Sequence, residues 1–324
     1  MIKSFRAFVI EDNKKKGIRS INKDYLMEGN VLIKISYSSF NYKDGLAITG
    51  KIPIIKAFPM IPGVDFVGTV EESSHKKFKK GHKVILNGWG VGEKHFGGFS
   101  QYARVNGDWL IHLPKKINEK QSMIIGSAGY TAALCVLEIT KKLKPNMGKI
   151  IVTGASGGVG SIATHLLAKL KYDVTALTGK KSKFLSKLGN INILDRKKFI
   201  FNKNPLGSQK WAGCIDTVGG DVLASIISEI KYDGIVASTG LAKSHILNTT
   251  VFPFILRNIT LSGVDCVYAS LSKRQKAWNF LEKYLDLRKL KLICSEKSLS
   301  DIKNLSNKIL KGKVEGRTII NLSI

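Results

Sequence analysis

Cysteine and histidine are scarce in this chain of 324 residues, and neither lies in a metal-binding pattern. No two of the four cysteines form a CxxC pair, and no two of the six histidines form an HxxxH pair. These spacings exclude a zinc ribbon and a redox dithiol. We therefore expect no metal site, and we expect small buried cysteines in a reducing compartment; the four are Cys135, Cys214, Cys266 and Cys294.

Long apolar runs and proline are also in short supply. No stretch comes close to the roughly 18 apolar residues that cross a membrane, and the apolar run near the N-terminus is too short for a signal peptide. Seven prolines among 324 residues exclude a proline-rich chain. The composition predicts a folded, soluble, cytoplasmic protein with no membrane partner.

Acidic residues are few relative to basic ones. Lysine and arginine number 52 and aspartate and glutamate 24, so the formal net charge is +28. The lysines are scattered, often in pairs such as Lys76-Lys77, and no basic stripe carries a nucleic-acid motif. We interpret the excess as a solvated surface, with an acidic small molecule as the alternative, and we expect no nucleic-acid partner.

The chain changes character near residue 118. Before it, segments of strand composition alternate with glycine, proline and asparagine clusters, and residues 41–60 are rich in turn formers. Asn118 and Gln121 resemble a capping box that opens a helix to about Lys142. Short apolar strands then alternate with helical segments up to Gly263, which predicts a doubly wound parallel sheet. Two more helices and a strand at 317–322 follow.

The strongest local motif is a glycine-rich turn between the strand at 149–153 and the helix at 158–170. Gly154 permits a tight turn, and Gly160 lets the helix pack close to the strand. Main-chain N–H groups at the start of the helix are suited to a pyrophosphate. We therefore predict dinucleotide contacts at Ser156, Gly157, Gly158 and Val159.

The end of the second strand of this sheet predicts which dinucleotide is bound. NAD enzymes usually place an acid there to bond the ribose 2′-hydroxyl, whereas this chain has Thr178, Gly179 and Lys180, followed by Lys181. Hydroxyls and cations suit a 2′-phosphate, so the sequence favours NADPH. Arg196, after the third strand, is a further candidate for the same phosphate.

Several strings along nearly the whole chain resemble one family of the medium-chain dehydrogenase/reductase superfamily. They are Ser39–Gly45, Phe58–Asp65, Asn87–Glu93, Ile125–Ala132, Phe254–Asn258 and Gly316–Thr318. The match is to the NADPH-dependent acryloyl-CoA reductases of the zinc-free, quinone oxidoreductase-like branch. The resemblance implies an α/β fold with a GroES-like, β-rich catalytic domain at 1–121 and 267–324 and a Rossmann coenzyme domain at 122–266.

The resemblance also implies an activity, which is reduction of the C=C bond of acryloyl-CoA to propionyl-CoA without a metal. Hydride from NADPH reaches the β-carbon, an enolate develops on the thioester oxygen, and the α-carbon is protonated. The stretches where zinc-dependent relatives carry Cys and His hold Asn41-Tyr42 and Phe58–Met60 here. An enoyl thioester polarises its own double bond, so no Lewis acid is required.

Residue roles follow from this reaction. Tyr42 is expected at the nicotinamide, contacting it or donating a proton, with Asn41 donating to the carbonyl oxygen and Asp44 orienting its neighbours. Lys43 and Arg104 are candidates for the CoA phosphates. By the resemblance, the residues that line the nicotinamide end are Leu241, Ile255 and Cys266.

Two other functions remain open at the level of sequence. One is an NADPH:quinone oxidoreductase of the zeta-crystallin type, which uses the same cofactor site with an uncharged substrate. The other is a non-catalytic protein that binds NADPH and RNA. The fold also suggests a homodimer formed through a sheet edge.

Overall fold

A computed structural model describes residues 4–12 and 15–323, which divide into two compact units. Unit 1 comprises 1–127, 266–275 and 293–324, and unit 2 comprises 128–265 and 276–292. The predicted boundaries at 121/122 and 266/267 lie close to two of these divisions. The structure assigns residues 276–292, expected in the catalytic domain, to unit 2 instead.

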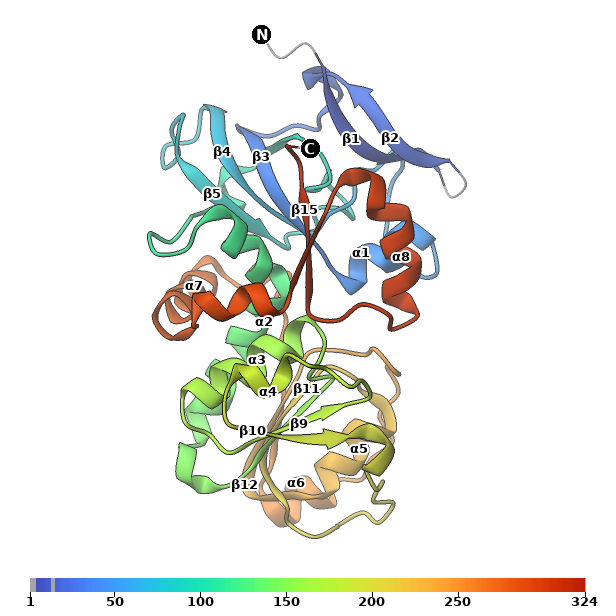
Figure 1. The fold of residues 1–324 in the computed structure, drawn as a ribbon, viewed down its shortest axis with the longest axis vertical. Coiled ribbons are helices and arrows are strands. Elements are labelled where there is room, and N and C mark those ends of the chain that lie inside the picture. The colour runs from blue at the N-terminus through green and yellow to red at the C-terminus, as the bar shows by residue number, and fades with distance from the viewer. Residues whose placement is uncertain (1–3, 13–14, 324) are drawn as a thin grey trace. The chain divides into compact units, whose positions relative to one another are not determined.

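Unit 2 is built on a six-stranded parallel sheet in the order β10-β9-β8-β11-β12-β13 (Figure 1). The strands are β8 (Ile150–Thr153), β9 (Val174–Thr178), β10 (Ile191–Asp195), β11 (Trp211–Asp216), β12 (Ile230–Ser238) and β13 (Thr260–Gly263). The connecting helices are α3 (Gly158–Lys169), α4 (Leu185–Leu188), α5 (Gly220–Ser228) and α6 (Phe252–Arg257). Numbered along the sheet this is the order 3-2-1-4-5-6, which confirms the doubly wound domain.

The central strands β8, β9 and β11 are buried along their whole length, and so is most of the second half of β12, which explains their mostly apolar sequences. Ile151, Cys214 and Val236, from three neighbouring strands, are almost completely inaccessible to solvent. A sheet covered by helices on both faces requires such strands. The apolar run alone therefore sufficed to predict them.

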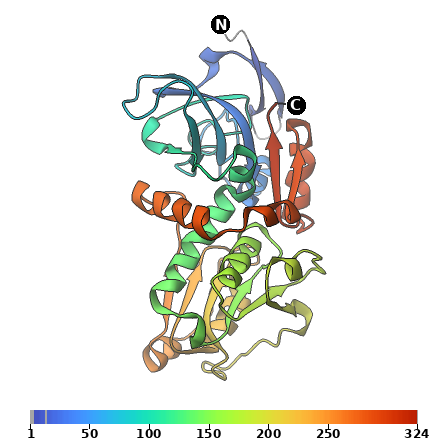
Figure 2. The same cartoon turned by 60° about the vertical axis from the view of Figure 1, so that its left-hand side comes forward.

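Unit 1 contains a mixed sheet in the order β14-β15-β3-β4-β5-β7, with β6 paired to β3 and a separate hairpin β1-β2. Its strands are β1 (Phe5–Ile10), β2 (Lys16–Ile21), β3 (Val31–Phe40), β4 (Asp65–Ser73), β5 (Lys83–Asn87), β6 (Tyr102–Val105), β7 (Ile111–His112), β14 (Cys294–Lys297) and β15 (Arg317–Asn321). The C-terminal strand β15 pairs antiparallel with β3. Figure 2 shows the two C-terminal strands, in red, beside helix α8 (Ile302–Leu310).

The core of unit 1 joins side chains from both ends of the chain. Phe40 and Phe99 stack with ring centroids 5.7 Å apart, and Ile302 and Ile320 belong to the same buried cluster. The C-terminal segment thus packs into the same domain as the N-terminal strands.

Helix α2 (Glu119–Lys142) begins as the sequence predicts. The amide of Gln121 donates to Asn118 Oδ1 at 2.8 Å, and the amide of Asn118 donates to Gln121 Oε1 at 3.1 Å, so the capping box is present. The helix is long and apolar enough to cross a membrane, so the expectation that no stretch reaches this length is wrong. Its most apolar window is 78% buried, as in the core helix of a folded domain.

Other differences concern short or polar elements. Residues 41–60, expected as turns, include helix α1 (Tyr42–Thr49), which Asn41 caps and which ends at Gly50 with φ 71°. The helix expected at 181–188 is only α4, and the one expected at 222–230 starts at Gly220 and ends at Ser228. Strands β2, β7 and β14 were not predicted, because they are very short or mostly polar.

Candidate functional site

The glycine-rich turn lies between β8 and α3 and is shaped for a close ligand. Gly154 has φ 58°, and a Cβ there would lie 2.3 Å from Thr217 Oγ1. A Cβ on Gly160 would lie 2.4 Å from the carbonyl oxygen of Gly154, so strand and helix are as close as glycine permits. Gly157 is the N-cap of helix α3 and supplies no side-chain cap, which leaves the first N–H groups of the helix to an anion.

Ser156 to Val159 occupy the turn and the first turn of α3, where an incoming pyrophosphate would meet main-chain N–H groups. Ser156 is buried, and its hydroxyl accepts a hydrogen bond of 2.9 Å from Thr178 Oγ1. That bond joins the glycine-rich turn to the end of β9. The two loops predicted to bind one nucleotide are therefore directly connected.

The end of β9 carries a hydroxyl and cations, and the structure brings Arg196 to it. Arg196 opens a short 3-10 helix after β10, and a Cβ on Gly179 would come within 2.9 Å of its guanidinium carbon. The Lys180 amide donates to Thr178 Oγ1 at 3.1 Å, which closes the loop. One surface suited to a phosphate is thus formed by Thr178, Gly179, Lys180 and Arg196.

Ser182 is a residue that sequence reasoning did not single out. Its hydroxyl is buried and has no hydrogen-bond partner among the residues that the structure describes. Buried hydroxyls are normally paired, so one left without a partner beside Lys180 fits a ligand oxygen as its missing acceptor. The signal in the sequence, one serine between lysines, is too common to have identified it.

A network of hydrogen bonds holds the neighbouring strand ends in place. Asp216, the last residue of β11, accepts bonds from Thr153 Oγ1 at 2.7 Å and from the Gly219 amide at 2.8 Å. Burial raises the pKa of Asp216 above its ordinary value. Thr217 Oγ1 donates to the carbonyl of Thr153, which ties β11 to the glycine-rich turn.

A cavity of about 370 Å³ lies in unit 2 at the carboxyl ends of β12 and β13. Apolar side chains and a few hydroxyls line it, among them Thr239, Leu241, Ser244, Leu247, Leu261 and Val264. Ligands of doubly wound sheets bind at this edge, and a mostly apolar cavity suits a planar ring. Of the residues predicted for the nicotinamide end, Leu241 lines the cavity.

The other two predicted nicotinamide residues lie elsewhere. Ile255 is on α6 and is 68% exposed, and it does not line the cavity. Cys266 belongs to unit 1, directly after the sheet of unit 2 ends. The contacts expected from them stay predictions.

In unit 1, Tyr42 is the first residue of α1 and is 38% exposed. Asp44 lies two residues further along the same turn and is almost completely buried. Its carboxylate accepts hydrogen bonds from the Asn41 amide at 2.7 Å and the Val64 amide at 3.1 Å. Asp44 therefore fixes the turn on which Tyr42 stands, and no bond from its carboxylate to Tyr42 or Lys43 is present.

Burial is the main cause that raises the pKa of Asp44 to about 7, and the nearby charge of Asp65 adds to it. The two main-chain hydrogen bonds act in the opposite direction but are outweighed. A carboxyl group beside the predicted proton donor thus titrates near neutral pH.

Both polar atoms of the Asn41 side-chain amide are hydrogen-bonded. Arg317 donates to Asn41 Oδ1 at 3.1 Å, while Asn41 Nδ2 donates to Ser39 O and to Ser39 Oγ, each at 3.1 Å. Both amide hydrogens therefore have acceptors within the protein. The expected donation from Asn41 to a substrate oxygen would require one of them to be released.

Sequence reasoning missed a buried polar cluster behind Asn41. Asp65 accepts bonds from Ser39 Oγ at 2.7 Å and from the Ser127 amide at 2.6 Å, and Arg317 donates to Ser39 Oγ at 2.7 Å. Burial lowers the pKa of Arg317. Charged residues opening the apolar strands β4 and β15 were the available signal.

The two cations expected at CoA phosphates have partners on different elements. Lys43 Nζ lies 2.8 Å from Glu93 Oε1, and Arg104, on β6, donates to the carbonyl of Lys23 at 3.3 Å. Lys43 is thus paired with an acid, whereas Arg104 bonds a neutral carbonyl, and contact of either with CoA phosphates stays a prediction. Among the described residues, no three His, Cys, Asp or Glu side chains form a group that could hold a metal ion.

Comparison with known proteins agrees with this architecture. Residues 27–115 match the alcohol dehydrogenase GroES-like domain. The chain is 44% identical over 98% of its length to "Probable acrylyl-CoA reductase AcuI" of Escherichia coli, covering 100% of that protein. It is 41% identical over 98% of its length to "Acrylyl-CoA reductase AcuI" of Ruegeria pomeroyi, covering 99% of that protein. A third relative, "Putative quinone oxidoreductase YhfP" of Bacillus subtilis, is 39% identical, with 94% of both chains covered.

Solved structures agree as well. The yhdH oxidoreductase of Salmonella enterica in complex with NADP superimposes with a TM-score of 0.94 at 44% identity, covering 98% of this chain and 99% of that one. The Bacillus subtilis protein yhfP with NAD bound also reaches 0.94, at 38% identity, with 99% and 100% covered.

A GroES-like domain joined to a doubly wound sheet with a glycine-rich nucleotide turn defines a medium-chain dehydrogenase/reductase. Within that superfamily, the chain belongs to the acrylyl-CoA reductase (AcuI) family.

Proposed function

We propose that the protein reduces the C=C bond of acrylyl-CoA to give propionyl-CoA, using NADPH and no metal. The observation that carries the proposal is identity of 41–44% over nearly the whole chain with two acrylyl-CoA reductases. The glycine-rich turn and the cations at the end of β9 support the cofactor. Bound NADPH supplies the hydride for the β-carbon.

The residues present fit this cofactor. The N–H groups from Ser156 to Val159 would hold its pyrophosphate. A Cβ on Gly160 would clash with the carbonyl oxygen of Gly154 and displace the turn that presents these groups. Thr178, Lys180 and Arg196, with the unpaired hydroxyl of Ser182, would hold the 2′-phosphate. The apolar cavity at the ends of β12 and β13 would take the nicotinamide end.

Tyr42 is the residue we assign to the proton. The hydroxyl of this partly exposed residue would bond the thioester oxygen while negative charge develops there, or give its proton to the α-carbon and regain one from solvent. Asp44 and the Arg317–Asp65 cluster hold Asn41 and the start of α1, so they are positioning residues.

Metal independence is part of the proposal. Asn41, at the position of a zinc-binding cysteine in zinc-dependent relatives, is bonded to Arg317 and Ser39. Activity is expected to survive a strong chelator. Loss on chelation, restored by zinc, would contradict the proposed mechanism.

A quinone reductase is the second candidate, and the 39% identity to the Bacillus subtilis protein favours it. NADPH consumption with acrylyl-CoA, crotonyl-CoA and a benzoquinone, at equal concentrations, separates the two. Highest turnover with acrylyl-CoA supports our proposal, and highest turnover with the quinone overturns it. NADPH binding with no turnover, together with salt-dependent RNA binding, would instead favour the non-catalytic alternative.

We also propose a cytoplasmic homodimer. Strand β13 is one of the two edge strands of the parallel sheet, and exposed apolar side chains precede it on α6, including Phe252, Ile255 and Leu256. Exposed edges and apolar patches of this kind favour pairing with a second copy. Light scattering on the purified protein is expected to give twice 35.7 kDa, and cell fractionation tests the compartment.

A further inference from the structure

Residues 51–59 of unit 1 form a loop that keeps both basic and apolar side chains at the surface. The loop lies between α1 and β4 in the chain. Lys51 and Lys56 are exposed, and so are Ile52, at 44%, and Phe58, at 42%. Exposed apolar side chains that gather in one segment indicate a binding surface rather than a simple connection.

The main chain of this loop is held firmly against the body of unit 1. The Lys56 amide donates to the carbonyl of Glu93 at 2.9 Å, and Met60, directly after the loop, exchanges two main-chain bonds of 2.8 Å with Ile10. Ile55 packs against two buried clusters of the same unit. The exposed side chains therefore stand on a fixed backbone, so a ligand that binds them does not have to order the loop first.

The charge of the loop is positive. No acidic residue occurs from residue 45 to residue 64, and the two that flank this stretch, Asp44 and Asp65, are buried. In the part of the chain that the structure describes, neither Lys51 nor Lys56 forms an ion pair. Two cations of this kind attract an anionic group.

Glu93, whose main chain contacts the loop, has its carboxylate bound elsewhere. Glu93 Oε1 lies 2.8 Å from Lys43 Nζ. Lys56 Nζ lies 3.2 Å from the carbonyl oxygen of Pro53, which is a neutral group. The charge of Lys56 is therefore available to a ligand.

Tyr42 and the loop lie at opposite ends of α1. Tyr42 is the first residue of the helix, and Lys51 follows its C-cap residue Gly50, so about 12 Å of helix axis separates the two ends. In CoA, the flexible pantetheine arm separates the thioester from the phosphates and the adenine ring. With the thioester at Tyr42, the arm is long enough for the phosphates to reach the loop.

We propose that the loop at residues 51–59 binds the nucleotide end of acrylyl-CoA. Lys51 and Lys56 bind phosphate oxygens, and Phe58 and Ile52 contact the adenine ring. This inference rests on the proposed function, and it adds which part of the chain recognises the substrate's nucleotide.

Acrylyl-pantetheine isolates this contact, because it carries the same thioester without the nucleotide. The double variant Lys51→Gln/Lys56→Gln loses two contacts to phosphate, so its KM for acrylyl-CoA is expected to rise about 10-fold at saturating NADPH, with kcat changed less than about 2-fold. Its kcat/KM for acrylyl-pantetheine is expected to stay within about 2-fold of the wild-type value. Equal losses with both substrates, or no loss with either, would overturn the proposal.

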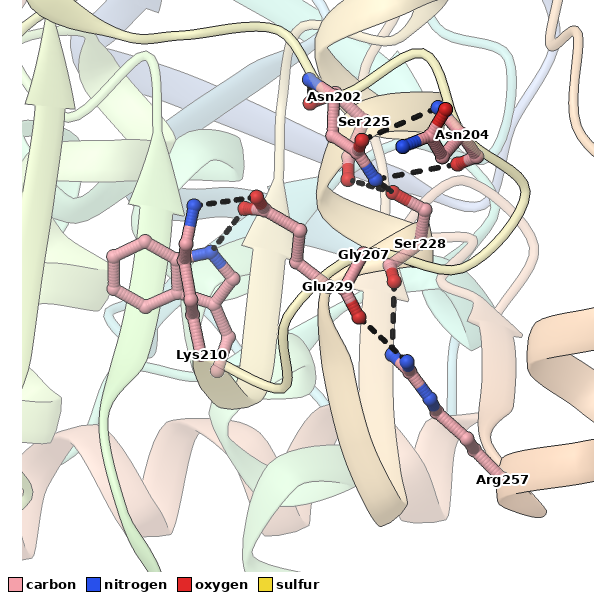
Figure 3. Close-up of polar contacts among 9 residues, drawn as sticks. Asn202, Asn204, Gly207, Lys210, Ser225, Ser228, Glu229 and Arg257 are labelled. Atoms are coloured by element: carbon pink, nitrogen blue, oxygen red, sulfur yellow. Dashed lines mark hydrogen bonds and ion pairs between the residues drawn. The ribbon is translucent and has the colours of Figure 1, made fainter.

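Two matched controls remove the same charge elsewhere. Lys79 and Lys80 are exposed neighbours in unit 1 that follow β4, whereas the loop precedes this strand of about 30 Å. Lys210, in unit 2, pairs with Glu229 at 2.6 Å (Figure 3). Lys79→Gln/Lys80→Gln and Lys210→Gln are expected to leave the ratio of the two kcat/KM values unchanged. A similar rise in KM for the controls would show that overall charge is responsible, and would overturn the proposal.

Two variants of Phe58 test the contact with adenine. Phe58→Ala removes the ring and is expected to raise the KM for acrylyl-CoA about 5-fold or more, because stacking on a base is lost. Phe58→Tyr keeps a ring and is expected to restore most of the affinity. An unchanged KM in Phe58→Ala would overturn this contact.

A binding measurement separates this proposal from the proposed function. Adenosine 3′,5′-bisphosphate represents the nucleotide end of CoA, and titration calorimetry with the NADPH-loaded protein requires no turnover. Binding that Lys51→Gln/Lys56→Gln abolishes would support the loop even if acrylyl-CoA were not reduced. Binding that the double variant retains would overturn the loop, and absence of both binding and turnover would overturn both proposals.

Discussion

At the scale of single residues, one substitution of Tyr42 can distinguish a catalytic role of its hydroxyl from a packing role of its ring. Its ring stands at the start of α1 on a turn fixed by Asp44, and it is partly exposed. If the hydroxyl stabilises the enolate or donates its proton, Tyr42→Phe lowers kcat by about 100-fold with little change in KM. Steady-state kinetics with acrylyl-CoA measures both constants. A silent substitution would reduce Tyr42 to a packing residue.

Arg196 is the residue on which the choice of cofactor is expected to depend. Its guanidinium group lies beside Gly179, and no acid ends β9. Arg196→Gln removes a charge-assisted bond to the 2′-phosphate, so the KM for NADPH is expected to rise about 10-fold. The KM for NADH, which lacks that phosphate, is the internal control and is expected to stay nearly constant. A parallel rise of both would remove Arg196 from the phosphate site.

The buried carboxyl of Asp44 predicts a pH dependence of stability. Its pKa is about 7 in the folded protein and near 3.9 when exposed, so between these values the folded state binds more protons than the unfolded state. The free energy of unfolding therefore falls as pH rises through this window, by up to about 4 kcal/mol from this group, and levels off above pH 7.

Asp44→Asn removes the titrating group, so its unfolding free energy is expected to depend less on pH than that of the wild type. Urea unfolding at pH 4.5, 5.5, 6.5 and 8 measures both slopes. The substitution also weakens the bonds to Asn41 and Val64, which lowers stability at every pH. Parallel curves would show that Asp44 is ionised throughout.

At the scale of elements, sequence patterns predicted the strands that are buried, and they missed the elements that form only through contacts with distant residues. Strands β8, β9 and β11 of unit 2 were predictable because each is a short, mostly apolar segment that is buried along its whole length. Strand β14 (Cys294–Lys297) was not, since its polar residues form a strand only by pairing with β15. Helix α1 was hidden because Asp44 and Gly45, which favour turns in isolation, here belong to a capping box and a buried face.

The glycine-rich turn carries the clearest prediction for an element. Gly160→Ala places a Cβ 2.4 Å from the Gly154 carbonyl oxygen, so either α3 or the turn must move. We expect loss of NADPH affinity by about 10-fold or more, since the N–H groups of the turn shift with it. Gly17→Ala is the matched control, because Gly17 lies in β2 of unit 1 and its added Cβ would meet only Lys303 Nζ, at 3.9 Å. Similar effects of both substitutions would contradict the close-packing argument.

At the scale of the whole molecule, the fold and cofactor class could be predicted from the chain, whereas the roles of several site residues could not. Lys43 looked free for a phosphate until the structure paired it with Glu93, fifty residues away. Asn41 looked available to substrate until Arg317, from the last strand, was found bonded to it. Pairings across such distances in sequence leave no local pattern, which is why these roles needed a structure.

The net charge of +28 is the property that remains to be tested at this scale. The 24 acidic side chains can neutralise fewer than half of the 52 basic ones, so a positive field surrounds the protein. A field of this sign attracts acrylyl-CoA, whose phosphates carry several negative charges, and salt screens it within about 8–10 Å at physiological ionic strength. We expect kcat/KM for acrylyl-CoA at saturating NADPH to fall several-fold between 50 and 300 mM KCl. An uncharged benzoquinone, assayed under the same conditions, has no charge to be steered and is expected to show almost no salt dependence. Equal salt sensitivity of the two substrates would mean that the excess charge does not act on the substrate, and that the basic side chains serve only as a solvated surface.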